Sequence, residues 1–177
     1  MNTIEHQADT SAHQKPTKLK ALGLLIGAML MSAGFIALCS VLGNHDFYAG
    51  FLFLLCWTVM EKIKLERLPH TILGCAFGAS LGYALQYLLG HAVPMGGLIF
   101  TAIVMLVLYC QFLGWLPLIA NLSAFTMLLV VTIPYIQAQG NFRDVALALA
   151  LGVAYFTPIL AAALHFSAKP KAVGAAT

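Results

Sequence analysis

Charged residues are scarce in this chain. Asp, Glu, Lys and Arg together make up only 8% of the 177 residues, whereas apolar residues make up 61%. An average soluble domain carries roughly 25% charged residues, because its surface must interact with water. Nine basic and six acidic side chains cannot cover a soluble domain of this length. We therefore predict an integral membrane protein, with the lipid bilayer as its main partner.

Catalytic and metal-binding motifs are also missing. The sequence contains no GxSxG, no HExxH, no phosphate-binding glycine loop and no dinucleotide fingerprint in a suitable context. The cysteines lie in apolar stretches without CxxC spacing, which argues against a disulfide framework or a zinc site. They are Cys39, Cys56, Cys75 and Cys110. We therefore expect no enzyme, no cofactor and no bound metal, and a net charge of +3 is too small to indicate a nucleic-acid partner.

The apolar segments contain no Asp, Glu, Lys or Arg at mid-membrane depth. Ionisable residues inside a membrane usually mark proton relays, ion sites or substrate counter-ions. Their lack argues against a carboxylate-coupled pump or antiporter. An ion-coupled secondary transporter is therefore placed third, after the two functional hypotheses given below, and it requires that Glu61 or Asp46 takes part in transport.

Six apolar segments are predicted between two short polar tails. Residues 1–19 mix both charge signs without an apolar period and are predicted to be a disordered cytoplasmic tail, and residues 169–177 form a second tail. The transmembrane domain occupies residues 20–168. Its segments run over about 21–43, 47–65, 71–89, 96–113, 118–136 and 145–166. These lengths approach the roughly 20 residues that cross a bilayer, so the predicted fold is an all-α bundle of six transmembrane helices with short loops.

The basic residues predict the orientation of this bundle. With six crossings, eight of the nine lie on one side of the membrane and only Arg143 lies on the other. The eight are Lys15, Lys18, Lys20, Lys62, Lys64, Arg67, Lys169 and Lys171. Because short cytoplasmic loops are enriched in Lys and Arg, both termini are predicted to be cytoplasmic in a bacterial inner membrane.

Small residues recur at helical spacing in three segments. Candidate helix-packing residues are Gly23, Gly27, Gly74, Gly78, Gly82 and Gly152. Glycines four residues apart let two helix backbones approach closely. The stripes predict either packing within the bundle or a seam between copies in a homo-oligomer. Pro134 and Pro158 predict kinks in the last two segments.

Uncharged polar residues within the segments are the first candidates for a site. They are Gln86, Gln111, Asn121, Ser123 and Thr126. Their side chains can join helices through hydrogen bonds, or they can line a narrow solute path. A second group in the loops opposite the termini is predicted to form a periplasmic mouth. It comprises His45, Asp46, His91, Arg143 and Asp144.

Three helices followed by three helices would place two halves of the chain in opposite orientations, as in inverted-repeat transporters. An echo links Arg67, followed by Gly82-Tyr83, to Arg143, followed by Ala154-Tyr155. The two spacings, 15 and 11 residues, differ, and the residues between them match poorly. The echo therefore gives little support for a repeat.

Two stretches resemble a family of small bacterial inner-membrane proteins of unassigned function. AGFLFLLCWTVMEKIKLERLPHTILGCAFGASLGYAL (49–85) has the family's aromatic helix, basic loop and glycine-striped helix. WLPLIANLSAF (115–125) is similar to a later Leu-Pro-rich element. The resemblance implies a small multispanning membrane protein and brings no substrate or functional residues.

The leading functional hypothesis is a passive channel or facilitator for a small, neutral or weakly charged solute. It follows from a small bundle that holds uncharged polar residues and no ionisable coupling group. A homo-oligomer is compatible with the glycine stripes. The alternative is an accessory or scaffold subunit that binds a larger membrane complex and transports nothing.

Overall fold

The computed structural model describes residues 18–91 and 94–167. Within these ranges all regular structure is helical, which confirms the predicted all-α class. The α-helices are α1 (Lys18–Val41), α2 (Tyr48–Leu55), α3 (Leu68–Gly90), α4 (Gly96–Phe112), α5 (Leu122–Val131), α6 (Pro134–Gln139) and α7 (Phe142–Ser167). A π-helical turn, η1 (Cys56–Met60), continues α2, and a 3-10 turn, η2 (Leu65–Arg67), precedes α3. The predicted tails lie almost entirely outside the described residues.

The chain divides into two units, and the boundary after Gly34 falls inside α1. The described part of the first unit, residues 18–34, is a single apolar helix that begins at Lys18, slightly before the predicted segment. A Cβ added at Gly23 or Gly27 would meet no other atom within 4 Å. The second unit begins at Phe35, and all contacts described below lie within it.

Two helices of the described chain are long and apolar enough to cross a membrane. They are η2 with α3 (Leu65–Gly90) and α7 (Phe142–His165). Shorter apolar helical stretches of 10–17 residues lie at Leu25–Val41, Tyr48–Met60, Gly96–Phe112 and Leu122–Val131. The described residues therefore contain two candidate spans, and they do not confirm the prediction of six.

The second and fifth predicted segments end earlier than expected. After η1 the chain turns through Lys62 and Ile63, whose φ angles of 50° and 56° are left-handed, so the predicted extension of this helix to Leu65 is wrong. Pro134 divides the fifth segment. Because proline disfavours helical geometry in the preceding residue, Ile133 is extended at ψ 128° and separates α5 from α6. In contrast, α7 remains helical through Pro158.

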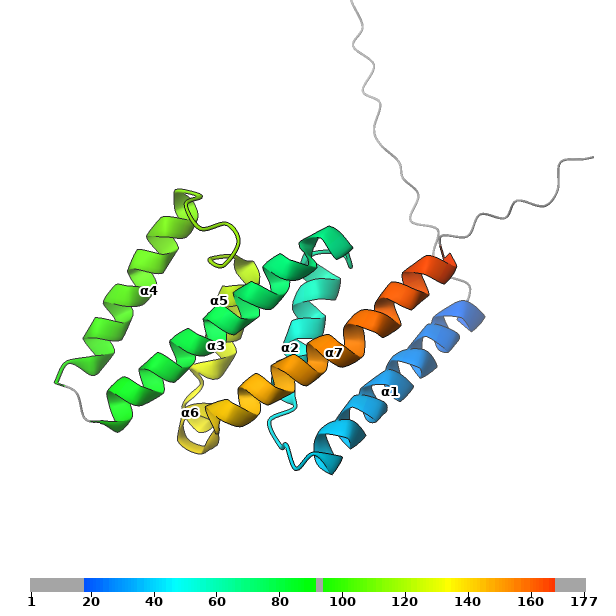
Figure 1. The fold of residues 1–177 in the computed structure, drawn as a ribbon, viewed down its shortest axis with the longest axis horizontal. Helices are drawn as coiled ribbons and strands as arrows, with labels where there is room; N and C mark the ends of the chain where they lie inside the picture. The colour runs from blue at the N-terminus through cyan, green and yellow to red at the C-terminus, as the bar shows by residue number, and fades with distance from the viewer. Residues whose placement is uncertain (1–17, 92–93, 168–177) are drawn as a thin grey trace, which may run out of the picture. The chain divides into compact units, whose positions relative to one another are not determined.

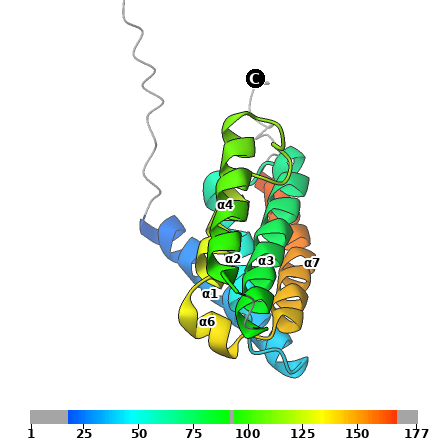
Figure 2. The ribbon, with the colours of Figure 1, turned by 90° about the vertical axis from the view of Figure 1, so that its left-hand side faces the viewer.

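The helices of the second unit pack as two close pairs (Figure 1). α3 lies along α5, α2 lies along α7, and α3 contacts α7 where the pairs meet. α4 packs mainly against the outer side of α3, as the view from the α4 side shows (Figure 2). Among the residues of α4, only Gly96 is buried.

The two pairs follow the same plan along the sequence. Leu122 at the start of α5 follows Tyr48 at the start of α2 by 74 residues, and Phe142 follows Leu68 by the same number. At this offset the short helices share the pattern Phe-x-x-Leu-Leu-x-x-Thr, at 51–58 and at 125–132. Residues 48–90 and 122–167 therefore form the two halves of an internal repeat, each with a short helix followed by a long one, while α6 is an addition in the second half and α1 and α4 lie outside the repeat.

Glycines at equivalent positions join each long helix to the short helix of the other half. Gly78 and Gly152 are both the eleventh residue of their helices. A Cβ at Gly152 would lie 2.6 Å from the Cα atom of Gly50, the third residue of α2. A Cβ at Gly78 would collide with the carbonyl oxygen of Ala124, the third residue of α5. Gly74 and Gly82 also face α5, so these glycines serve packing within the chain.

Two asparagines make equivalent hydrogen bonds. Asn44, before α2, donates its side-chain amide to the carbonyl oxygen of Asp144 at 2.7 Å. Asn121, before α5, donates to the carbonyl oxygen of His70, also at 2.7 Å. Each acceptor is the third residue of a long helix, so the acceptors are 74 residues apart, whereas the two asparagines are 77 residues apart. The true equivalence therefore pairs Gly78 with Gly152, and the echo that pairs Gly82 with Ala154 has the wrong register.

Candidate functional site

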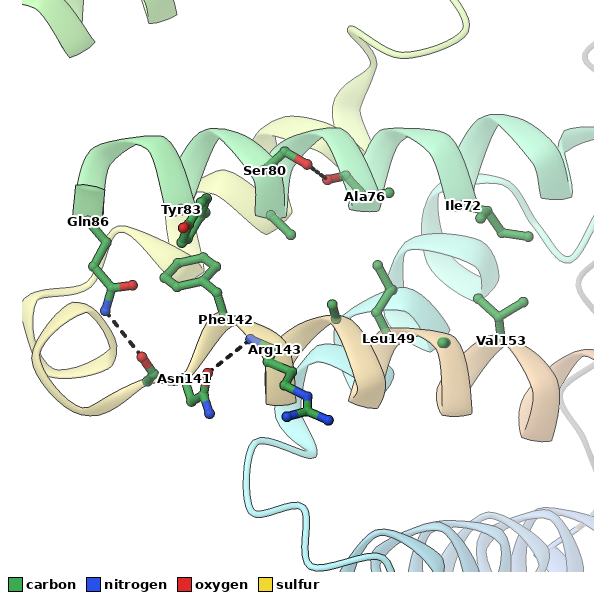
Figure 3. A pocket seen from close by; sticks show the side chains of 14 residues that line it. Ile72, Ala76, Ser80, Tyr83, Gln86, Asn141, Phe142, Arg143, Leu149 and Val153 are labelled. Atoms are coloured by element: carbon green, nitrogen blue, oxygen red, sulfur yellow. Dashed lines mark hydrogen bonds between the residues drawn. The ribbon is translucent and has the colours of Figure 1, made fainter. Parts of the chain in front are cut away.

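An open groove with a volume of about 1180 Å³ runs between α3 and α7 (Figure 3). Its α3 wall consists of Ile72, Ala76, Ala79, Ser80, Tyr83 and Gln86. Its other wall consists of Gly140, Asn141, Phe142, Arg143, Ala146, Leu149, Ala150 and Val153. Most of these side chains are small and apolar, and the hydrogen-bonding groups lie mainly toward the end that holds Gln86 and Asn141. The lining residues include no carboxylate.

Gln86 closes the polar end of the groove. Its side-chain amide donates to the carbonyl oxygen of Gln137 at 3.0 Å and to that of Gly140 at 3.2 Å. These two bonds tie the C-terminal part of α3 to the segment that leads into α7, so α3 and α7 run antiparallel. Beside them the Tyr83 ring packs on Phe142 with centroids 5.5 Å apart (Figure 3).

Gln137 forms further hydrogen bonds next to the polar end of the groove. Its side-chain amide donates to the carbonyl oxygens of Val131 at 2.7 Å and Gly82 at 3.2 Å. Val131 is the last residue of α5, so Gln137 provides a hydrogen bond to the end of the helix that Pro134 interrupts. Sequence reasoning missed Gln137, Asn141 and Tyr83, although an amide three residues after a proline in an apolar segment marks such a break.

The other predicted path residues lie away from the groove. Asn121 caps α5 by accepting from the backbone N–H of Ala124 at 3.0 Å, and Thr126 donates to its own helix. Gln111, in the last turn of α4, makes no side-chain hydrogen bond within the described residues. Of the five predicted path residues, only Gln86 therefore lines the groove.

Ser123 belongs to a separate cluster that the sequence did not indicate. Its hydroxyl and the thiol of Cys75 both lie beside the sulfur of Cys56. All three side chains are buried where α5, α3 and η1 meet. No group of three or more potential metal-ligating His, Cys, Asp or Glu residues occurs in the described part of the chain.

Asp46 and Asp144 of the predicted mouth lie close together. The Asp46 carboxylate lies beside the backbone N–H of Asn141, and the Asp46 backbone N–H donates to the Asn44 side chain at 2.8 Å. Partial burial raises the pKa of Asp46, and the charge of Asp144 acts in the same direction. The Asn141 N–H group and nearby His45 oppose the rise in that pKa.

The remaining mouth residues are placed differently. Arg143 is exposed at the rim of the groove, and its guanidinium points away from α3 (Figure 3). The His91 ring packs against Tyr87 one turn earlier in α3, with the rings tilted by 32° and their centroids 4.1 Å apart. The structure therefore joins Asp46 and Asp144 but does not gather all five residues into one mouth.

A scan against protein-family models, a search of curated proteins and a search of solved structures each gave no match. The resemblance of residues 49–85 and 115–125 to small bacterial inner-membrane proteins therefore stays a prediction. The functional conclusions depend on the geometry of this chain alone.

Proposed function

We propose that this protein is an integral inner-membrane facilitator that moves a small, uncharged or weakly charged solute by passive permeation. In this proposal six segments cross the membrane, and both termini are cytoplasmic. The observation that carries the proposal is the internal repeat, in which the long helices α3 and α7 run antiparallel. Two halves of opposite orientation are a recurrent architecture of membrane transporters.

The short helices support the same function. Discontinuous helices at corresponding positions of two halves often mark the solute path of a transporter. Here α2 changes into the π-helical turn η1, and α5 is interrupted before α6. Both changes occur near the end of the shared Phe-x-x-Leu-Leu-x-x-Thr pattern, because η1 begins at Cys56 and α5 ends at Val131.

The exposed surface supports a membrane location. Large apolar side chains that face outward include Leu98, Met105, Leu106 and Phe112 of α4, with exposed fractions of 61% or more. A contiguous apolar surface of this kind is costly in water but favourable in lipid. The short helices then cross the bilayer with help from the adjoining segments, including α6 after α5.

Stopped-flow light scattering on proteoliposomes tests the function directly. The purified protein should accelerate volume changes driven by at least one of glycerol, urea or acetamide over the rate in protein-free vesicles. The acceleration should persist without an ion gradient, because no coupling group is proposed. Rates equal to those of protein-free vesicles for all three solutes would contradict a facilitator of this class.

One observation favours the alternative of an accessory subunit. α4 packs mainly against α3 and leaves most of its length exposed, so it offers a surface for a larger membrane complex or a second copy. The proteoliposome experiment distinguishes the two functions, because an accessory subunit moves none of the solutes by itself.

A further inference from the structure

We propose that the groove between α3 and α7 binds the solute, and that its ligand is an uncharged molecule with an amide or hydroxyl group on a small apolar body. This inference rests on the proposed function and names the site and the chemical class of its substrate. It keeps Gln86 from the predicted path residues and places binding away from the other four, Gln111, Asn121, Ser123 and Thr126.

The position of the groove relative to the repeat is the first argument. At the 74-residue offset, Ile72 corresponds to Ala146, Ala76 to Ala150 and Ala79 to Val153. All six line the groove. The groove therefore lies where the two halves of the repeat meet, and equivalent residues of both halves form its walls. Transporters built from repeats bind their substrates at such an interface.

The polar end supplies the chemistry for recognition. Both N–H groups of the Gln86 amide are used by the carbonyl oxygens of Gln137 and Gly140, so its Oε1 atom remains as an acceptor. Asn141 accepts from the backbone N–H of Arg143 through Oδ1, and its Nδ2 group remains as a donor. Tyr83 is 54% exposed and adds a hydroxyl group. A solute with an amide or hydroxyl can satisfy these groups in pairs.

The charges around the groove favour an uncharged solute. Asp144 lies on the same face of α7 as Ala148 and Gly152, and this face packs on α2 rather than α3. Asp46 lies beside the backbone N–H of Asn141, and Arg143 turns its guanidinium away from α3 (Figure 3). An ion in the apolar part of the groove would lose hydration without a compensating charge.

A large side chain in the middle of the groove tests the site. Ala150→Trp should reduce the permeation of acetamide and glycerol by at least tenfold, because the indole fills space between α3 and α7. Leu147→Trp is the matched control on the same helix, since Leu147 is exposed and does not line the groove. It should retain the wild-type rate. Permeation through Ala150→Trp at the wild-type rate would overturn the inference while leaving the proposed function intact.

The chemical class has its own test in the same vesicles. Wild-type protein should admit acetamide more readily than formate, and Gln86→Leu should slow acetamide at least threefold. Faster entry of formate, lost in Arg143→Gln, would overturn the assignment to uncharged solutes.

Cysteine labelling tests the groove without measuring transport. It therefore still tests the site if Ala150→Trp fails to fold. Ala150→Cys should react with a water-soluble methanethiosulfonate reagent, and molar acetamide should slow this reaction. Leu147→Cys should react at a rate that acetamide does not change. Equal effects of acetamide on both cysteines, or no reaction at Ala150→Cys, would overturn the groove as the binding site. If the wild-type protein moves no solute but acetamide still slows labelling of Ala150→Cys, passive transport is refuted and the groove remains the binding site.

Discussion

Gly152→Ala should strongly destabilise the packing of α2 on α7. The added Cβ would lie 2.6 Å from the Cα atom of Gly50 and 3.2 Å from its carbonyl oxygen. These are backbone atoms, so the contact can be relieved only if the helices separate. Overpacking of this kind costs about 1–3 kcal/mol, whereas alanine gains up to about 1 kcal/mol of helix propensity over glycine. Subtracting the full propensity gain leaves a net loss of up to about 2 kcal/mol in the free energy of unfolding.

The repeat makes this prediction sharper, because Gly78→Ala should cause a similar loss at the equivalent contact with Ala124. Gly97→Ala is the matched control, since a Cβ there would meet no atom within 4 Å. Unfolding by sodium dodecyl sulfate can be followed through the fluorescence of buried Trp57. Gly152→Ala should unfold at a lower detergent fraction than wild type, and Gly97→Ala should not. Equal midpoints for Gly152→Ala and Gly97→Ala would refute the proposed contact between α2 and α7.

Two further predictions concern the loops that precede the short helices. Asn44→Ala and Asn121→Ala should each lower the free energy of unfolding by about 1–2 kcal/mol, because each leaves a carbonyl of a long helix without its donor. The control Ser80→Ala should change it by less than about 0.5 kcal/mol. Equal midpoints of detergent unfolding for all three variants would contradict this prediction. Asp46→Asn should raise the melting temperature at pH 7. A raised pKa means that the folded state binds protons more tightly, so the charged carboxylate lowers stability above that pKa. The gain should vanish below the ordinary Asp pKa of about 3.9, and a gain independent of pH would exclude this cause.

Composition and apolar period were sufficient to predict the helical class and the approximate position of most helices. The differences arise from local chemistry. Pro134 lies in an unbroken apolar run, and its effect as a break between α5 and α6 depends on Gln137, which satisfies the freed carbonyl of Val131. The turn after Met60 requires positive φ at Lys62 and Ile63, which neither residue type indicates.

The repeat and the groove were harder to predict, because they depend on which helices pack together. Glycine spacing correctly pointed to close helix contacts in α3, but the sequence did not reveal that α5 is the partner. Asn121 had the composition of a path residue, yet its amide is fully used by backbone groups of His70, Leu118 and Ala124. The groove lies on the other face of α3, where Ala76 and Ala79 gave no polar signal.

The most direct test of the account is the orientation of the two halves in the membrane. Lys64 and Ala138 are exposed and separated by the same 74 residues as the short helices, so they occupy equivalent positions in the two halves. Single cysteines there should react with a membrane-impermeant maleimide from opposite sides in intact and opened cells, Lys64→Cys from the cytoplasm and Ala138→Cys from the periplasm. Labelling of both from the same side would contradict the inverted repeat.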